Sequence, residues 1–163
     1  MCPACISTAA IAVAAGATGV RVDSVSLSSL AYVCSAVSPQ SGFYFTVPGC
    51  RVIDTRLADG PTGGPALAGG ATRTFVVAGS CGVPASALAV ALNVTVTGTS
   101  ADGSLKAFQA LSPPPIVDVV SWSAAQTRAN DTITRLGAAG DVSIQNGSTS
   151  GCEVIVDVLG YFE

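Results

Sequence analysis

The chain has 163 residues, of which 49% are hydrophobic and only 10% charged, and its net charge is −3. That length suits one domain with a leader or an extension, and the apolar fraction supplies a sizeable core. Histidine is absent, which excludes Ser-His-Asp and Cys-His catalytic centres and removes the commonest metal ligand. The cations form no cluster that could neutralise phosphates, so we expect no nucleic-acid partner. They are Arg21, Arg51, Arg56, Arg73, Lys106, Arg128 and Arg135.

Residues 1–20 carry no charge and are rich in alanine, which indicates an apolar leader or N-terminal extension separate from the fold. They are nearly long enough to span a bilayer, so we expect a membrane contact only through this segment, if it is not cleaved. Because a signal peptide's basic region is missing, a helix packed on a partner and a wrongly chosen start codon are alternatives. Cys2 and Cys5 form a CxxC, but no second pair or histidine completes a zinc site. We expect a local disulfide or two idle thiols there, and no metal or cofactor.

From residue 20 onward the apolar residues take the period of two that is typical of β-strands. Pro48 and Gly49 are expected to stop one of these strands. Residues 59–70 hold five glycines and two prolines, a density that predicts an irregular loop. Strand signals cover residues 20–27, 30–37, 43–47, 74–77, 88–97, 104–110, 116–122, 132–136, 141–145 and 152–162.

These short strands, separated by turn signals and with no amphipathic helix after residue 20, predict an all-β fold. We expect an antiparallel β-sandwich of the jelly-roll or Greek-key type over residues 21–163. A closed barrel has the same sequence pattern and stays an alternative.

Four blocks follow one another between residues 49 and 162. They read GCRVIDTR at 49–56, CGVPASALAVALNVTV at 81–96, QTRAN at 126–130 and VIVDVLGYF at 154–162. Together they resemble a domain that is common in secreted proteins of actinobacteria, acidobacteria and similar lineages, with the patterns CRxxDTR, CGVPxxAxAxxLNVTV, QTxAN and VIVDVxGYF. The resemblance implies an exported all-β module at residues 49–162, and it implies no activity for that module.

The cysteines indicate an oxidising compartment, because the chain has an even number of them, six, in a small domain rich in glycine and threonine. At least one disulfide is therefore expected, and a secreted or cell-surface location with it. The resemblance implies which cysteines pair: Cys50 and Cys81 lie inside two of the family's blocks. Cys34 with Cys152 is the next candidate pair.

The densest group of charges consists of Arg51, Asp54 and Arg56. In a regular strand Arg51 would face one side of the sheet, while Asp54 and Arg56 would share the other. The group is interpreted as an ion pair that fixes the chain before the long loop, with a carboxylate or sugar clamp as the alternative. Asp157 is expected to face away from the neighbouring valines and to pair with Arg56 or Arg128.

These and the remaining candidate residues also suit two other functions. Asp54 and Asp157 could form the acid pair of a glycoside hydrolase, if both lie in one open cleft. Trp122 and Tyr161 could stack on sugar rings or be buried. The candidate binding residues are Arg51, Asp54, Arg56, Trp122, Arg128, Asp157 and Tyr161.

A surface with so few charges tolerates contact with another copy or a partner. The sequence therefore favours a secreted or cell-surface, non-enzymatic β-sandwich for attachment, carbohydrate contact or self-assembly. Its expected partners are a second copy of itself or a surface polysaccharide. The alternative is a structural subunit of an extracellular filament or coat, in which residues 1–40 supply a strand or helix that completes a neighbour's sheet.

Overall fold

The computed structural model describes residues 42–163. The predictions for residues 1–41, which comprise the apolar leader, the CxxC, the first two strands and Cys34, lie outside the described residues. Within residues 42–163 no helix is long and apolar enough to cross a membrane.

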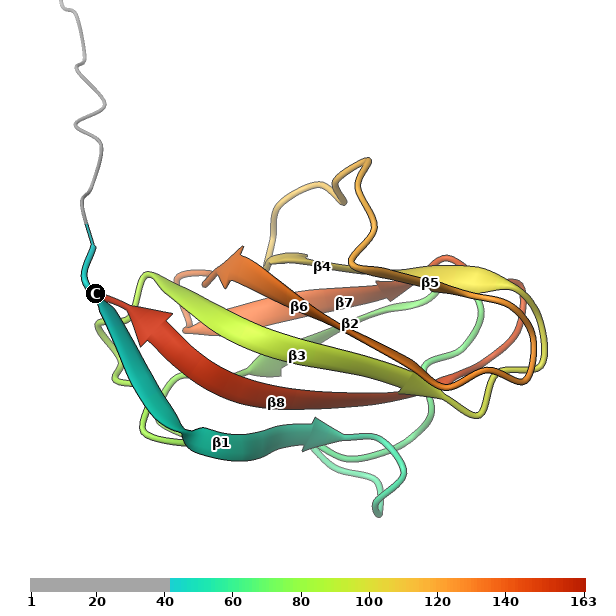
Figure 1. The fold of residues 1–163 in the computed structure, drawn as a ribbon, viewed down its shortest axis with the longest axis horizontal. Coiled ribbons are helices and arrows are strands. Elements are labelled where there is room, and N and C mark those ends of the chain that lie inside the picture. Colours follow the sequence, from blue (N-terminus) through green and yellow to red (C-terminus); the bar gives the residue numbers. More distant parts are fainter. Residues whose placement is uncertain (1–41) are drawn as a thin grey trace, which may run out of the picture. The chain divides into compact units, whose positions relative to one another are not determined.

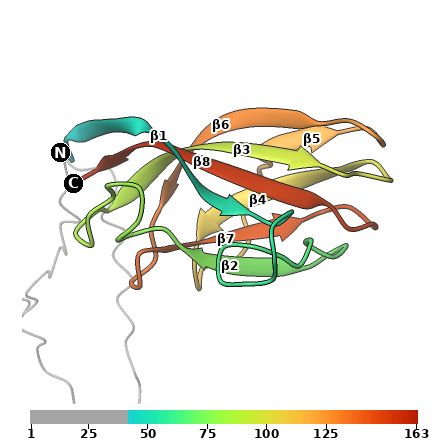
Figure 2. The same ribbon diagram turned by 90° about the horizontal axis from the view of Figure 1, so that it is seen from below.

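Two four-stranded antiparallel sheets face each other in the described part of the chain (Figures 1 and 2). The first has the order β1-β8-β3-β6 and the second the order β2-β7-β4-β5, and every connection except β4–β5 crosses between them. This is the strand order of a jelly roll, so the predicted antiparallel β-sandwich is confirmed. The strands are β1 Tyr44–Asp54, β2 Thr72–Val76, β3 Ala89–Thr97, β4 Gly103–Gln109, β5 Val120–Trp122, β6 Arg128–Arg135, β7 Asp141–Asn146 and β8 Glu153–Phe162.

The core lies between the sheets and follows the alternation of the sequence. Along β3 every second residue is buried, and along β8 Val154, Val156 and Val158 are fully buried, as predicted. These side chains meet Phe75, Leu105 and others from the opposite sheet in one cluster. Burial of the alternate residues on the inner face therefore fixes the register of the central strands.

β1 differs from its prediction, because it continues through Pro48 and Gly49 to Asp54. Opposite β8, two extra residues of β1 lie between Thr46 and Cys50, which forms a bulge at the proline. β1 is an edge strand, so the missing proline N–H and the bulge leave its single ladder with β8 in place.

β5 is shorter than predicted, beginning at Val120 instead of residue 116. Pro113, Pro114 and Pro115 lack the N–H groups that a ladder needs, and pairing with β4 begins only where the Val119 N–H donates to the Leu105 carbonyl at 2.8 Å. Residues 111–119 instead form a loop that projects from the sandwich between β4 and β5 (Figure 1).

A disulfide joins Cys50 in β1 to Cys81, with their Cα atoms 5.6 Å apart, which confirms the pairing that the resemblance implied. It crosslinks an edge strand to the turn after β2. Cys152 lies in the core, where burial raises the pKa of its thiol to about 11. It forms no disulfide with another described residue, and its proposed partner Cys34 lies outside them.

The predicted loop at residues 59–70 contains no strand and is held by polar contacts from two side chains. The Arg73 guanidinium donates to carbonyls of this loop, including that of Gly63 at 3.1 Å. Asn146, fully buried at the end of β7, donates from its amide nitrogen to the carbonyls of Leu67 at 3.0 Å and Ala68 at 3.2 Å. The same side chain donates to the Ser150 carbonyl at 2.9 Å and accepts from the Ser148 N–H at 2.9 Å. One amide thus connects this loop to the turn before β8.

Candidate functional site

Four of the predicted site residues form one cluster on β1 and β8. Arg51 donates to both carboxylate oxygens of Asp157, at 2.8 and 3.1 Å, and to Asp54 at 3.2 Å. Arg56 donates to both oxygens of Asp54, at 2.8 and 2.7 Å, and its backbone N–H adds a third bond. One bidentate arginine–carboxylate pair therefore connects β1 to the middle of β8, and a second connects the end of β1 to the turn that follows it.

The structure corrects two predictions for this cluster. Arg51 and Asp54 lie on the same side of β1, because one extra residue between Arg51 and Ile53 shifts the register against β8. The partner of Asp157 is Arg51, which is its direct neighbour across the two strands, and not Arg56 or Arg128.

The chemistry of the cluster is that of a structural ion network. Hydrogen bonds from Arg56, assisted by Arg51, lower the pKa of Asp54 to about 2 although burial opposes the shift. A glycosidase acid must instead keep its proton near neutral pH, which requires a raised pKa. Since Arg51 also bridges Asp54 and Asp157, the hypothesis of an acid-pair hydrolase is not supported.

We expect the stability conferred by Asp54 to depend on pH. Its folded-state pKa is about 2, below the ordinary 3.8, so the contribution is complete above about pH 4 and is lost as the pH falls towards 2. The Asp54→Asn variant should lose about 2 kcal/mol of unfolding free energy at neutral pH. Urea unfolding at a series of pH values should show this difference shrink below pH 4; a constant difference down to pH 2 would contradict the assignment.

The other predicted residues do not join the cluster. Trp122 is 5% exposed in the core and donates from Nε1 to the Ala101 carbonyl at 2.9 Å, so its ring cannot stack on a sugar from solvent. Tyr161 stacks on Phe45 with ring centroids 5.2 Å apart. Arg128 is exposed at the start of β6. The seven candidates therefore form no single binding site.

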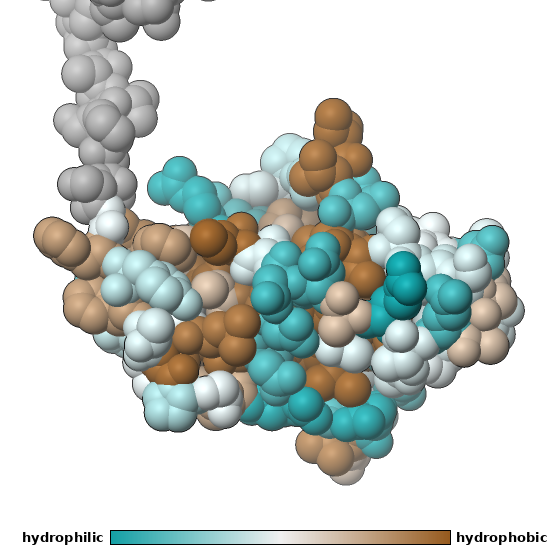
Figure 3. All heavy atoms as spheres, viewed as in Figure 1, coloured by the Kyte–Doolittle hydropathy of each residue, from teal (hydrophilic) through white to brown (hydrophobic). Residues whose placement is uncertain are grey.

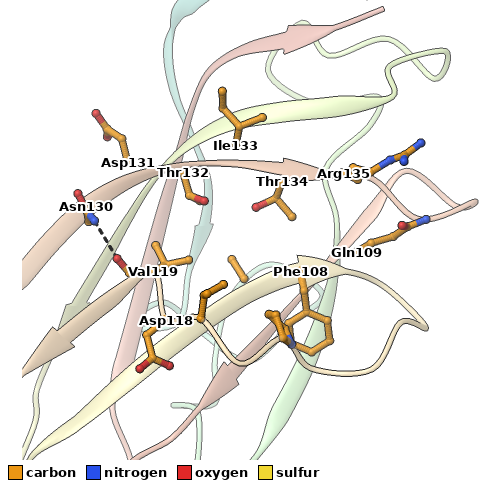
Figure 4. A pocket seen from close by; sticks show the side chains of 13 residues that line it. Phe108, Gln109, Asp118, Val119, Asn130, Asp131, Thr132, Ile133, Thr134 and Arg135 are labelled. Atoms are coloured by element: carbon orange, nitrogen blue, oxygen red, sulfur yellow. Dashed lines mark hydrogen bonds between the residues drawn. The ribbon is translucent and has the colours of Figure 1, made fainter. Parts of the chain in front are cut away.

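A groove that the sequence did not predict lies between β4, β6 and the loop before β5 (Figure 4). It encloses about 400 Å³, and it exists because three-residue β5 pairs only with residues 103–105 of β4. Asn130, Thr132 and Thr134 point from β6 towards β4, and Asn130 donates to the Val119 carbonyl at 2.8 Å. The lining residues are Ala107, Phe108, Gln109, Pro115, Val117, Asp118, Val119, Asn130, Asp131, Thr132, Ile133, Thr134 and Arg135.

Thr134 gives this groove an unused polar group. The residue is only 4% exposed, and its hydroxyl has no hydrogen-bond partner among the described residues. In Figure 4 the hydroxyl points from β6 towards β4. A buried hydroxyl without a partner is unfavourable, so Thr134 is a destabilising feature of this wall of the groove as residues 42–163 form it.

β6 also presents an open backbone edge beside the groove. It is the last strand of the first sheet and pairs with β3 in unbroken register from Ala89–Arg135 to Val96–Arg128. Leu136, just after β6, donates to the Leu88 carbonyl at 2.9 Å, so the even-numbered residues of β6 direct their N–H and C=O groups towards β3. The backbone N–H and C=O groups of Asp131, Ile133 and Arg135 consequently point away from β3, towards the open side of the sheet.

The geometry is thus that of a jelly-roll domain with an open edge at β6 beside a groove, and comparisons with known proteins add little to it. No protein-family model matches the chain, and no curated protein matches it. The solved structure of the Tobacco streak virus coat protein dimer is similar with a TM-score of 0.36 and 13% identity, over 74% of this chain and 88% of that one. A likeness at that level carries no argument about the function of this chain.

Proposed function

We propose that this chain is an exported, non-enzymatic β-sandwich module that acts by contact, through self-assembly or attachment to a surface polysaccharide. The observation that carries the proposal is the open side of the sandwich, where the β6 edge, the groove and the projecting loop lie together. Export is supported by the Cys50–Cys81 disulfide, because such bonds persist in oxidising compartments.

Exposed apolar side chains support self-assembly in particular. Leu111 is 100% exposed, Ile116 97% and Val117 66%, all on the projecting loop. This loop forms the apolar projection at the top of Figure 3, and its Pro115 and Val117 line the groove. Ile133 adds a fourth such side chain on β6, with 65% exposure. Apolar groups gathered at one open edge are typical of a surface that another macromolecule covers.

The polar lining of the groove supports polysaccharide attachment as the second candidate function. Its volume of about 400 Å³ is within the range of small-ligand sites, roughly 300–1,000 Å³. Gln109 and Thr132 offer amide and hydroxyl groups of the kind that bind sugar hydroxyls. The filament or coat alternative, in which residues 1–40 complete a neighbour's sheet, depends on residues outside those described and stays a prediction.

The proposed function is tested on the protein secreted from its native host. Light scattering on a size-exclusion column gives the mass per particle, intact mass spectrometry gives the processed chain, and sedimentation with the host's surface polysaccharide gives attachment. We expect particles larger than one chain or co-sedimentation that the Gln109→Ala/Thr132→Val variant weakens. A monomer that sediments with no polysaccharide would contradict both forms of the proposal.

A further inference from the structure

The open edge of β6 carries a stretch that is complementary to itself. Residues 131–135 read Asp-Thr-Ile-Thr-Arg, so the two ends carry opposite charges at equal distances from Ile133. Asp131 accepts one hydrogen bond from Asn93 at 2.7 Å, and neither Asp131 nor Arg135 has an ion-pair partner within residues 42–163. Both charges are exposed, on the same side of β6 as the exposed Ile133.

We infer that a second copy of this chain docks on β6 through its own β6, antiparallel, about a two-fold axis at Ile133. This inference rests on the proposed function and specifies its self-assembly. In that arrangement Ile133 lies opposite Ile133 of the second copy, and Asp131 lies opposite its Arg135 on both sides of the axis. A two-fold interface needs such a self-complementary surface, and opposite charges directly across two strands stabilise the pair.

The backbone supports the same register. The residues whose N–H and C=O groups point away from β3 are Asp131, Ile133 and Arg135, and the two-fold axis places these residues opposite one another. Each facing pair can therefore exchange two backbone hydrogen bonds, as antiparallel neighbours do. A register shifted by one residue would oppose outward-pointing and inward-pointing groups and lose these bonds.

The groove side of β6 supports it independently. Thr132 and Thr134 both point into the groove, and the axis brings Thr134 opposite Thr132 of the second copy. Threonine pairs across antiparallel strands make favourable contacts, so the facing threonines fit the same register on this side of the strand. The two-fold axis keeps both projecting loops on the same face of the joined sheet, so their apolar side chains would be covered at the junction.

The test is a charge exchange in the full chain, read by sedimentation equilibrium over a wide range of protein concentrations. Asp131→Arg and Arg135→Asp each create two like-charged pairs per dimer. Each should raise the dimer Kd by on the order of tenfold or more. The double variant D131R/R135D restores opposite charges and should return the Kd towards the wild-type value. Mixing the two single variants should give heterodimers, because one copy then carries both arginines and the other both aspartates.

Arg128→Asp is the matched control, since it makes the same charge change on the same strand but outside the self-complementary stretch. It should leave the Kd unchanged, and thermal melting checks that every variant folds. Self-association that is unaffected by both single reversals would overturn the β6 contact and leave the proposed function standing. A monomeric protein that still binds polysaccharide would also overturn the β6 contact and leave the proposed function standing. A monomeric protein that binds no polysaccharide would overturn the β6 contact and the proposed function together.

Discussion

Replacing Asn146 with alanine is expected to lower the free energy of unfolding by about 3–4 kcal/mol. The side chain is fully buried, and its amide satisfies three backbone carbonyls and one N–H. The Leu67 and Ala68 carbonyls keep backbone partners, but alanine removes the bonds to the Ser150 carbonyl and the Ser148 N–H, which costs about 1–3 kcal/mol per buried group before relaxation. Chemical denaturation followed by tryptophan fluorescence measures the change, because Trp122 is buried in the core.

Two further variants sharpen this test. Asn146→Asp has the same shape but turns the donating nitrogen into an oxygen that faces three carbonyls, so it should be at least as destabilising as alanine. Asn93→Ala is the control, since Asn93 is half-buried and donates only to Asp131; its effect should stay within about 1 kcal/mol. Equal effects of Asn146→Ala and Asn93→Ala would show that the buried amide does not hold the loop.

Removing the disulfide is the second change with a large expected effect. The Cys50→Ser/Cys81→Ser variant should lose roughly 3–4 kcal/mol, because the bond closes a loop with a sequence separation of 31 residues in the unfolded chain. The loss should be visible as a lower urea midpoint for the variant and for the reduced wild-type protein alike. Cys152→Ser is the contrasting variant, because Cys152 is a free thiol buried in the core. Its effect on the urea midpoint should be the same under oxidising and reducing conditions.

A change in stability on reduction that is equally large in the double-serine variant would contradict this assignment. In that case a bond that involves other cysteines of the chain would be responsible. The midpoint of the double variant should therefore be the same with and without reductant.

The central strands could be predicted from the sequence because their signal is local. β3 is buried on one face only, and its burial appears directly as alternation of Val90, Leu92 and Val94. Val154 and Val156 of β8 alternate in the same way, although Ile155 between them is also buried. The edge strands were harder to predict. Pro48 and Gly49 end most strands, but β1 has only one neighbour and accommodates them as a bulge.

The arrangement of the candidate residues depends on contacts between distant segments. Arg51 contacts both Asp157 and Asp54 because a bulge shifts the register of β1 against β8. The alternation of apolar and polar residues in β1 does not indicate where this bulge lies. The groove was missed because it arises from the shortness of β5, and residues 116–119 look as apolar as a strand. The one local signal was the run Asp131–Arg135, whose opposite charges flank a β-branched residue, but its meaning depends on β6 being the last strand of its sheet.

The bulge at Pro48 and Gly49 makes the two edge strands of the first sheet different. A proline and extra residues interrupt the β1 border, whereas β6 runs in unbroken register. Within residues 42–163, growth of this sheet by edge pairing is therefore easier from β6 than from β1, and in the proposed β6 dimer the first sheet of each chain keeps only its interrupted β1 edge. An all-β chain with few repelling charges is at risk of open-ended, fibre-like stacking. In the proposed dimer, the proline in β1 therefore disfavours open-ended growth of the first sheet.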